Sequence, residues 1–501
     1  MKGSVNLIPF FVIIPLAGAF ITSVLGKRIK AFSDISANIV AFALLAMSAY
    51  SVGLVSKCGV LAYKVGMWVP PIGILLVLDG LSTFMLVTVN LIAFLITIYS
   101  VNYMERYTDK WKFYTLFLLM LAGMEGVIIT GDIFNLFVFL EIASVASYAL
   151  VAYGTEAEEL EASFKYLVMS SVGSLFVLLG IALIYGYTST LNMADIAATL
   201  LQKGPGRITL LVSVLFIMGF GLKAALVPFH AWLPDAHPSA PAPISAMLSG
   251  VLIKALGIYV LVRLFYNVIG MTSTVLSTFL FMGALSMMVG VLLAVGQWDL
   301  KRLLAYHSIS QIGYVILGLG LGTPLGVLGG LFHLFNHSVF KSLLFLNSGA
   351  VEYATGTRNL KEMGGLKDRM PVTAGTSLIA SMSIAGIPPF NGFWSKLIII
   401  IATVQAGRLG YAVFAVIASI LTLASFMKVQ RYAFFGKLDP RNDKVKEAPA
   451  LMAFSMVALA IICVLAAALA LPSVSKHFLS AASNVILSGV EYSKRVFEAI
   501  I

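Results

Sequence analysis

Five lysines and one glutamate stand within long apolar stretches of this sequence, where a lipid bilayer would exclude charge. They are Glu141, Lys165, Lys223, Lys254, Lys341 and Lys396. A charged side chain at the centre of a membrane helix costs about 2.5–3.5 kcal/mol on insertion scales, and such residues are functional by default. Since carboxylates and amines exchange protons, a series of them inside one membrane protein predicts a proton relay.

Two of these residues are predicted to form a functional pair. Glu141 has Ser144 and Tyr148 at i+3 and i+7, so both hydroxyls share its helical face and are expected to hydrogen-bond the carboxylate. Lys223 is the expected ionic partner, because a nearby carboxylate stabilises a desolvated ammonium. A salt bridge that only packs two helices is the alternative for Glu141, and snorkelling to the interface is the alternative for Lys223.

The remaining relay residues follow along the chain. Lys254 is expected to take the proton next, and Lys396 closes the series. His333, His337 and Lys341 fall at i, i+4 and i+8, hence on one helix face. Two histidines four residues apart also suit a metal ion, but no third ligand is apparent, so relay is favoured.

Further ionisable residues are candidates for which a structural role is equally open. They are His230, His307, Lys165, Asp79 and Glu125. His307 stands where it could pass a proton between Lys254 and His333. Lys165 follows an acidic run at 156–161, so the alternative for it is a counter-charge near the membrane interface.

The composition indicates a polytopic helical membrane protein. Of 501 residues, 60% are hydrophobic and 11% are charged, whereas a soluble protein carries about 25% charged residues. The two cysteines do not cluster with each other or with histidines, so we expect no iron–sulfur, haem or zinc site and no cofactor in this chain. The net charge of +11 is interpreted as loops facing anionic lipid, not as a nucleic-acid surface.

Apolar runs of roughly 20 residues, the length of a membrane helix, give about fourteen spans. They start near residues 5, 33, 72, 112, 133, 160, 208, 243, 273, 302, 324, 371, 409 and 449. Loops after odd-numbered spans are richer in Lys and Arg, which places both termini outside the cell membrane. Residues 473–501 are expected to form an amphipathic helix on the membrane or on a partner subunit, with a solvated tail as the alternative.

Two spans are interrupted by proline and glycine. Pro228, Pro234 and three further prolines follow Lys223, and Gly386 with Pro388-Pro389 precedes Lys396. Broken helices in corresponding positions of two halves indicate a transport site, although two ordinary proline kinks are the alternative. The breaks fall in spans seven and twelve, which suits five-helix repeats. The predicted organisation is 1–111 (spans 1–3), 112–270 (first repeat, spans 4–8), 271–436 (second repeat, spans 9–13) and 437–501 (last span and amphipathic segment).

These strings together resemble the antiporter-like subunits shared by respiratory complex I, Mrp cation/proton antiporters and archaeal membrane-bound hydrogenases. The resemblance rests on Glu141 in its Asn-x5-Glu context and on Lys223-Ala-Ala-Leu-Val-Pro-Phe-His-Ala-Trp-Leu-Pro-Asp-Ala. Lys254-Ala-Leu-Gly-Ile-Tyr, Asp299-Leu-Lys-Arg-Leu-Leu-Ala-Tyr and Pro-Pro-Phe-x-Gly-Phe-x-x-Lys396 extend it. The string around His307 looks most like the Mrp D-type subunit and its hydrogenase counterpart.

The resemblance implies an all-α fold of fourteen transmembrane helices with two inverted five-helix repeats, broken in helices 7 and 12. It implies Glu141–Lys223 as a functional pair, Lys254 and the 333–341 residues as a central axis, and Lys396 as the terminal site. Implied partners are antiporter-like and small membrane subunits, and also a redox module with iron–sulfur clusters.

The expected function is therefore a proton-translocating subunit of a multi-subunit complex in the plasma membrane, with Na⁺ as a second candidate ion. In such an oxidoreductase or antiporter complex this chain would perform no redox chemistry. A non-conducting scaffold subunit and a stand-alone solute transporter are the alternatives.

Overall fold

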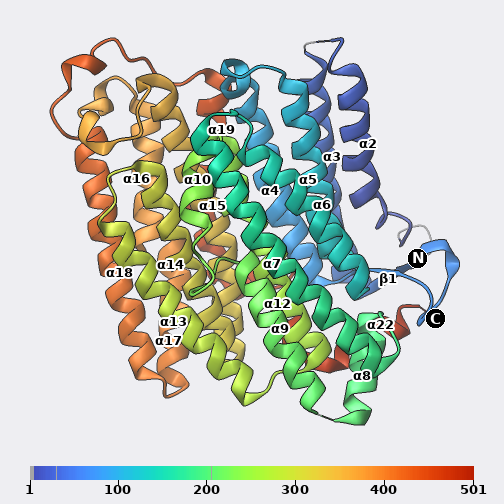
Figure 1. Ribbon diagram of the computed structural model, residues 1–501. Coiled ribbons are helices and arrows are strands. Elements are labelled where there is room, and N and C mark those ends of the chain that lie inside the picture. The colour runs from blue at the N-terminus through green and yellow to red at the C-terminus, as the bar shows by residue number, and fades with distance from the viewer. Residues whose placement is uncertain (1–4, 30, 205, 501) are drawn as a thin grey trace.

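Long helices that run side by side make up most of the chain (Figure 1). The computed structural model describes residues 5–29, 31–204 and 206–500. The helices in the first half are α2 (Phe10–Leu25), α3 (Phe32–Cys58), α4 (Gly80–Tyr103), α5 (Lys110–Ile129), α6 (Ile133–Val151), α7 (Ala157–Thr188), α8 (Met193–Lys203), α9 (Arg207–Lys223), α10 (Leu233–Ser239) and α11 (Ala242–Met247). Those in the second half are α12 (Val260–Val262), α13 (Ser273–Val295), α14 (Leu300–Gly320), α15 (Pro324–Thr355), α16 (Pro371–Ala385), α17 (Asn391–Gln405), α18 (Leu409–Val429), α19 (Ala450–Leu465), α20 (Pro472–Ser475), α21 (Leu479–Leu487) and α22 (Tyr492–Glu498).

The central helices are buried within the bundle, and the outer helices expose apolar side chains. Within the described residues, ten helices are long and apolar enough to cross a membrane, and α2 and α16 are shorter apolar helices. The outer helices expose large apolar side chains, among them Phe42, Leu175 and Phe454. A surface of this kind suits lipid, since contiguous exposed apolar area is rare on soluble monomers. The chain is a mostly helical multi-pass membrane protein, as the composition predicts.

A two-stranded hairpin interrupts the helical pattern ahead of α4. Strands β1 (Leu61–Lys64) and β2 (Leu75–Leu78) pair antiparallel, with Leu61 opposite Leu78. The hairpin is a local exception to the expected helical fold, and the span predicted to start near residue 72 is corrected here, because the apolar run 75–78 is a strand. The helix begins only at Gly80, where the Asp79 carboxylate accepts hydrogen bonds from the first-turn amides of Leu81 and Ser82.

Both predicted helix interruptions are present. Helix α9 ends at Lys223, and the chain does not return to regular helix until α10 begins ten residues later. Helix α16 ends at Ala385, and Gly386 takes a left-handed φ of +80° before α17 begins at Asn391. A side chain at position 386 would be strained by this φ, which explains the glycine.

The segment between α11 and α13 is wound more widely than an α-helix. Three π-helical runs, η3 (Leu248–Leu252), η4 (Lys254–Tyr259) and η5 (Arg263–Ile269), flank the short α12. The apolar window of this helix is buried throughout, against α5, α9 and α15. Single π turns often mark functional positions, and here the wide turns extend for about twenty residues around Lys254.

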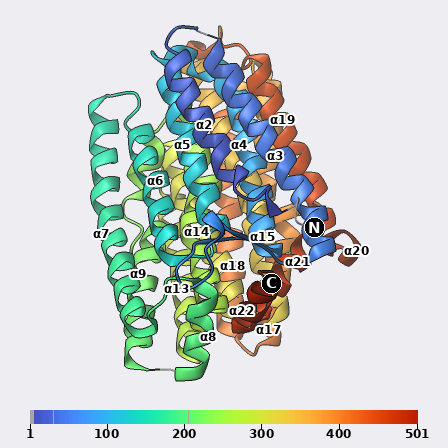
Figure 2. The ribbon, with the colours of Figure 1, turned by 90° about the vertical axis from the view of Figure 1, so that its right-hand side faces the viewer.

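The C-terminal segment differs from the single amphipathic helix predicted for residues 473–501. It forms three short helices, α20 to α22, and its apolar residues Leu479, Ala482 and Ile486 are buried against α4 and α15 of the same chain. The apolar face therefore covers this chain's own bundle. Phe478, with φ −122° and ψ −76°, separates α20 from α21, and Gly489, with a φ of +57°, separates α21 from α22, so no continuous helix forms. The two chain ends lie side by side beneath α3 (Figure 2).

Candidate functional site

Glu141 and Lys223 meet between α6, α7 and α9. The Lys223 Nζ lies 3.7 Å from Glu141 Oε1, and its side chain is almost fully buried while that of Glu141 is one-third exposed. The amine donates to the hydroxyls of Ser170, at 2.6 Å, and Ser144, at 3.0 Å. The Ser174 hydroxyl donates to Glu141 Oε1 at 2.5 Å. The predicted pair is therefore in contact, at the point where α9 breaks.

The hydroxyls around this pair are only partly those expected from the sequence. Ser144 accepts from Lys223 and does not bind Glu141. The Tyr148 hydroxyl has no partner among the described residues, and its ring packs edge-on against Tyr166. Ser170 and Ser174 of α7 supply the remaining bonds. They were missed, although two serines at i and i+4 in an apolar helix are a readable signal.

Lys254 lies fully buried in the π-helical segment. Its amine donates to two carbonyl oxygens of the preceding turn, Ser249 at 2.5 Å and Gly250 at 2.7 Å. One turn further, Gly257 packs directly on Ala224, the residue that follows Lys223; a Cβ at Gly257 would lie within 2.7 Å of the Ala224 backbone. The broken helix and the π-helix thus touch between the two lysines.

His333, His337 and Lys341, together called the row, lie on the face of α15 that is turned toward α14. His333 Nε2 lies 3.2 Å from Gln311 Oε1, and the His333 and His337 rings stack 6.4 Å apart. Neither ring nitrogen of His337 has a hydrogen-bond partner within the described chain. The Lys341 amine donates to the carbonyl oxygen of Leu304. Within residues 5–29, 31–204 and 206–500, no group of three His, Cys, Asp or Glu side chains is placed to hold a metal ion.

Lys396 connects to this row through two neighbours. The hydroxyl of Ser395 lies 2.9 Å from His333 Nδ1. The Lys396 amine lies 4.8 Å from the centre of the Tyr314 ring, and that ring is 5.4 Å from the His333 ring. The amine also donates to the Ile384 carbonyl oxygen, at 2.7 Å, in the second broken helix. The sequence did not single out Tyr314 or Gln311, which with Ser308 form a polar stripe on α14.

Three other histidines differ in their surroundings. His307 is buried on α14, where its Nε2 lies 2.9 Å from the Ser425 hydroxyl. His230 lies half-buried in the interruption after α9. His237 on α10, which the sequence-based assignment omitted, is fully buried, and neither of its nitrogens has a partner among the described residues. The Phe345 ring lies between His237, at 5.6 Å, and the Lys341 amine, at 5.5 Å.

Asp79 belongs to a structural ion pair away from this row. Its carboxylate binds both terminal nitrogens of Arg263, at 2.8 and 2.9 Å, and both side chains are buried. Four residues along the helix, the Asn267 amide donates to the Val485 carbonyl oxygen at 2.8 Å. The pair therefore joins the start of α4 to η5, and Asn267 fastens the C-terminal segment to the bundle.

Glu125 forms no ion pair with any lysine or histidine among the described residues. It is fully buried in α5, both of its carboxyl oxygens lack a hydrogen-bond partner among the described residues, and the Asn90 side chain of α4 faces it. A buried ionised carboxylate needs a cation or several donors, and none is provided here.

Lys165 lies at the charged end of the bundle, outside the row. Its side chain is 46% exposed and pairs with Glu161 at 2.7 Å and Asp235 at 3.2 Å. This matches the interfacial counter-charge alternative. The expected burial within an apolar span is wrong, because α7 begins at residue 157 and Lys165 falls in its first turns.

The same end carries further ion pairs that link segments far apart in the sequence. Arg302 binds Asp235 at 3.2 Å, and Arg358 binds Asp299 at 2.7 Å and Glu158 at 2.5 Å. Burial by itself would lower the pKa of the Arg358 guanidinium, but the carboxylates of Asp299 and Glu158 hold that pKa above its usual value. These pairs tie α7, α10 and α14 together where the loops leave the bundle.

Comparisons with known proteins agree with this arrangement. The family described as "NADH:quinone oxidoreductase/Mrp antiporter, TM" matches residues 130–422, and "NADH-Ubiquinone oxidoreductase (complex I), chain 5 N-terminus" matches residues 69–114. The D-type subunit of the Na(+)/H(+) antiporter of Alkalihalophilus pseudofirmus is 36% identical over 437 residues, 86% of this chain and 87% of that protein.

Two solved structures share the whole fold. A chain of the Mrp complex from a Dietzia species has a TM-score of 0.91 and 30% identity, with all of both chains covered. A chain of the membrane-bound sulfane sulfur reductase, an archaeal respiratory membrane complex, has a TM-score of 0.89 and 31% identity, with 99% of each chain covered. The chain therefore belongs to the NADH:quinone oxidoreductase/Mrp antiporter transmembrane family, as an antiporter-like member of the D type.

Proposed function

We propose that this chain is a proton-translocating subunit of a multi-subunit membrane complex. The observation that carries the proposal is the Glu141–Lys223 contact at the first broken helix, at the head of a buried series of amines and imidazoles. That series comprises Lys223, Lys254, His333, His337, Lys341 and Lys396; it begins beside the half-buried Glu141 and ends at the second broken helix. Burying this many titratable groups in a membrane costs free energy, and such groups mark ion pathways.

The pair supplies a switch for the series. Lys223 is desolvated, so its ammonium form depends on the nearby carboxylate. When Glu141 moves away or takes up a proton, Lys223 loses that stabilisation and releases its own proton toward Lys254. Glu141 is one-third exposed and is the member of the pair that reaches solvent or a neighbouring subunit.

The finer topology follows from the same helices. We assign fourteen crossings, formed by the ten long apolar helices together with α2, the broken pairs α9–α10 and α16–α17, and α15. The assignment places one broken helix in each of two inverted five-helix repeats, residues 112–270 and 271–436. The excess of basic residues in alternate loops supports a plasma-membrane orientation with both termini outside.

Partners are proposed from the relatives. The similar chains come from an Mrp complex and from a respiratory membrane complex. We therefore propose that other antiporter-like and small membrane subunits flank this chain. The proton is the proposed ion, with Na⁺ as the exchanged or additional ion, and any redox module with iron–sulfur clusters would belong to a partner.

The test is ion-driven proton movement in everted vesicles that contain the assembled complex. Glu141→Ala and Lys223→Ala should each abolish it while the complex still assembles. Lys165→Ala is the matched control, because this lysine pairs with Glu161 and Asp235 outside the row. Wild-type transport by both assembled variants would identify a scaffold subunit. Solute uptake by the purified chain alone would identify a stand-alone transporter.

A further inference from the structure

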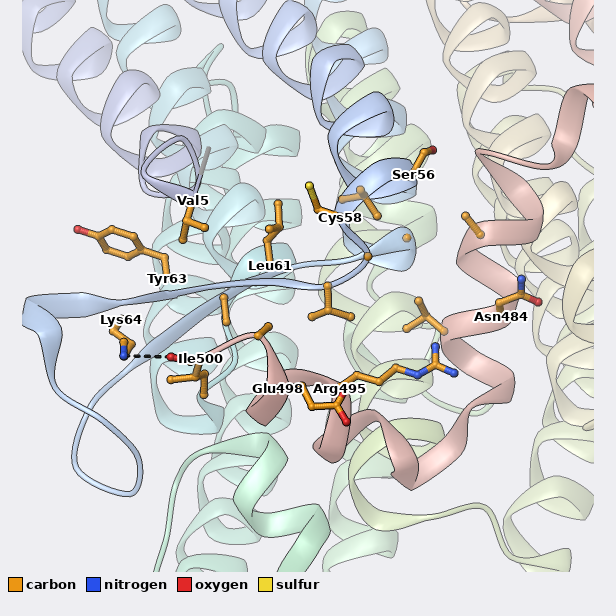
Figure 3. A pocket seen from close by; sticks show the side chains of 18 of the residues that line it. Val5, Ser56, Cys58, Leu61, Tyr63, Lys64, Asn484, Arg495, Glu498 and Ile500 are labelled. Carbon is orange, nitrogen blue, oxygen red and sulfur yellow. Dashed lines mark hydrogen bonds between the residues drawn. The ribbon is translucent and has the colours of Figure 1, made fainter. Parts of the chain in front are cut away.

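A large pocket opens beside the two chain ends, away from the buried row (Figure 3). It has a volume of about 1270 Å³, more than the roughly 300–1,000 Å³ of ordinary small-molecule pockets. Its walls come from the end of α3, the strand β1 and the C-terminal segment. None of its lining residues belongs to the proposed relay.

The pocket walls have an apolar side and a charged side. Val55, Leu61 and Val485 give the pocket an apolar side. Among the described lining residues, the cations Lys64, Lys476 and Arg495, together with His477, outnumber the carboxylate Glu498. Figure 3 shows Arg495 on the C-terminal segment, below Cys58 and Leu61 in this view. A net positive rim on an apolar wall selects a molecule with an anionic head and an apolar body.

The approach to the pocket fits the apolar body of such a molecule. Helix α3 exposes Ile35, Ile39, Phe42 and Tyr50 at helical spacing, each by more than half. Gly53 continues this face and lies one turn before Ser56, which lines the pocket. Among the described residues, no atom lies within 4 Å of where a Cβ would stand on Gly53 or Gly59, so the space beside these two glycines is open.

We infer that this pocket binds the headgroup of an anionic phospholipid, whose acyl chains lie along the exposed face of α3. Arg495 and Lys476 are the proposed phosphate ligands, because guanidinium and ammonium groups bind phosphate by charge-assisted hydrogen bonds. Lys64 is less free to do so, since its amine donates to the Ile500 carbonyl oxygen at 3.2 Å. The C-terminal segment would then join this chain to the surrounding lipid.

The chain carries its own probe for this site. Cys58 lines the pocket, whereas the other cysteine, Cys463, is fully buried. The rate of Cys58 alkylation by a water-soluble maleimide is measured for the complex in nanodiscs of phosphatidylcholine alone or with phosphatidylglycerol. Phosphatidylglycerol is expected to slow labelling, by about fivefold for each cationic ligand that binds it.

Matched variants separate the ligands from general surface charge. The double variant Lys476→Gln/Arg495→Gln should label equally fast in both lipids. Lys494→Gln removes an exposed charge from the same helix, next to Arg495 but outside the pocket, and should keep the wild-type difference. If the double variant does not assemble, Arg495→Gln alone, with retained phosphatidylglycerol counted by native mass spectrometry, gives the same comparison.

Three outcomes would overturn the inference. Equal labelling of the wild type in both lipids would exclude an anionic lipid. Protection in phosphatidylcholine discs by inorganic phosphate alone would identify a soluble anion instead. Complete protection of Cys58 in every lipid would mean that a partner subunit fills the pocket.

Discussion

Ser170 holds the Lys223 amine more closely than Glu141 does, at 2.6 Å against 3.7 Å. The lysine at the first helix break is thus positioned by one serine of α7, whereas the carboxylate is held by another, Ser174. A pair held in this way can change its separation without displacing the amine. This arrangement is what a charge-operated switch requires, and it makes the serine a separate target for mutation.

Replacing Ser170 tests this positioning. Ser170→Ala should lower ion-driven proton movement by about 10- to 100-fold, because a hydrogen bond to a charged group contributes about 1.5–3 kcal/mol. Transport is measured by fluorescence quenching in everted vesicles with assembled complex. Ser213→Ala is the control, since the Ser213 hydroxyl donates only to the Thr209 carbonyl oxygen of its own helix. A wild-type rate for Ser170→Ala would remove the serine from the switch.

The contact between Gly257 and Ala224 predicts a steric effect on stability. Gly257→Ala puts a methyl group within 2.7 Å of the Ala224 backbone, so we expect a loss of about 1–3 kcal/mol, seen as a lower Tm. Gly186→Ala is the matched control, because no atom of the described residues lies within 4 Å of its Cβ position and alanine favours helix by about 0.5–1 kcal/mol. An unchanged Tm for Gly257→Ala would show that the two segments do not pack closely.

For the buried Asp79–Arg263 pair, the losses of folding stability in the two single variants should not add up in the double variant. Asp79→Leu or Arg263→Met alone leaves one buried charge unpaired, which costs about 3–5 kcal/mol, whereas the double variant should cost much less. Thermal unfolding of the three variants measures this. Transport per assembled complex should stay near wild type in whichever variants fold. Additive losses of stability would contradict the pairing.

Glu125 is expected to tolerate an isosteric neutral replacement. With no cation or donor set around its carboxyl, the uncharged acid is the form that the site accommodates, and Glu125→Gln keeps its shape. Both the Tm and the transport rate should be close to wild type. Glu141→Gln, measured in parallel, should lose transport. A large loss of transport in Glu125→Gln would instead place this residue on an ion path.

Much of the architecture can be predicted from the sequence, because each membrane helix requires a run of roughly 20 apolar residues. The predicted starts at 133, 243, 273 and 409 each fall within one residue of a helix start. Proline and glycine runs also located both breaks. The hairpin was missed because Leu75–Leu78 is as apolar as the helix that follows, so hydropathy alone does not separate them. Only the Asp79 cap marks the boundary.

The site was less readable than the fold. Charged residues are easy to identify in an apolar sequence, which is why Glu141, Lys223 and Lys254 were predicted. Ser170, Tyr314 and His237 have roles that depend on which helices meet. The π-helical winding around Lys254 is likewise set by packing against α5, α9 and α15, and no local residue pattern specifies it.

Three of the buried lysines, Lys223, Lys254 and Lys341, differ in whether their hydrogen-bond partners can exchange a proton. Lys254 and Lys341 donate to backbone carbonyl oxygens, which do not exchange protons, so these bonds offer neither amine a group that could take up its proton. Lys223 instead touches hydroxyls and a carboxylate that exchange protons. For a proton to pass along the proposed series, the side chains of Lys254 and Lys341 would therefore first have to leave these carbonyl oxygens.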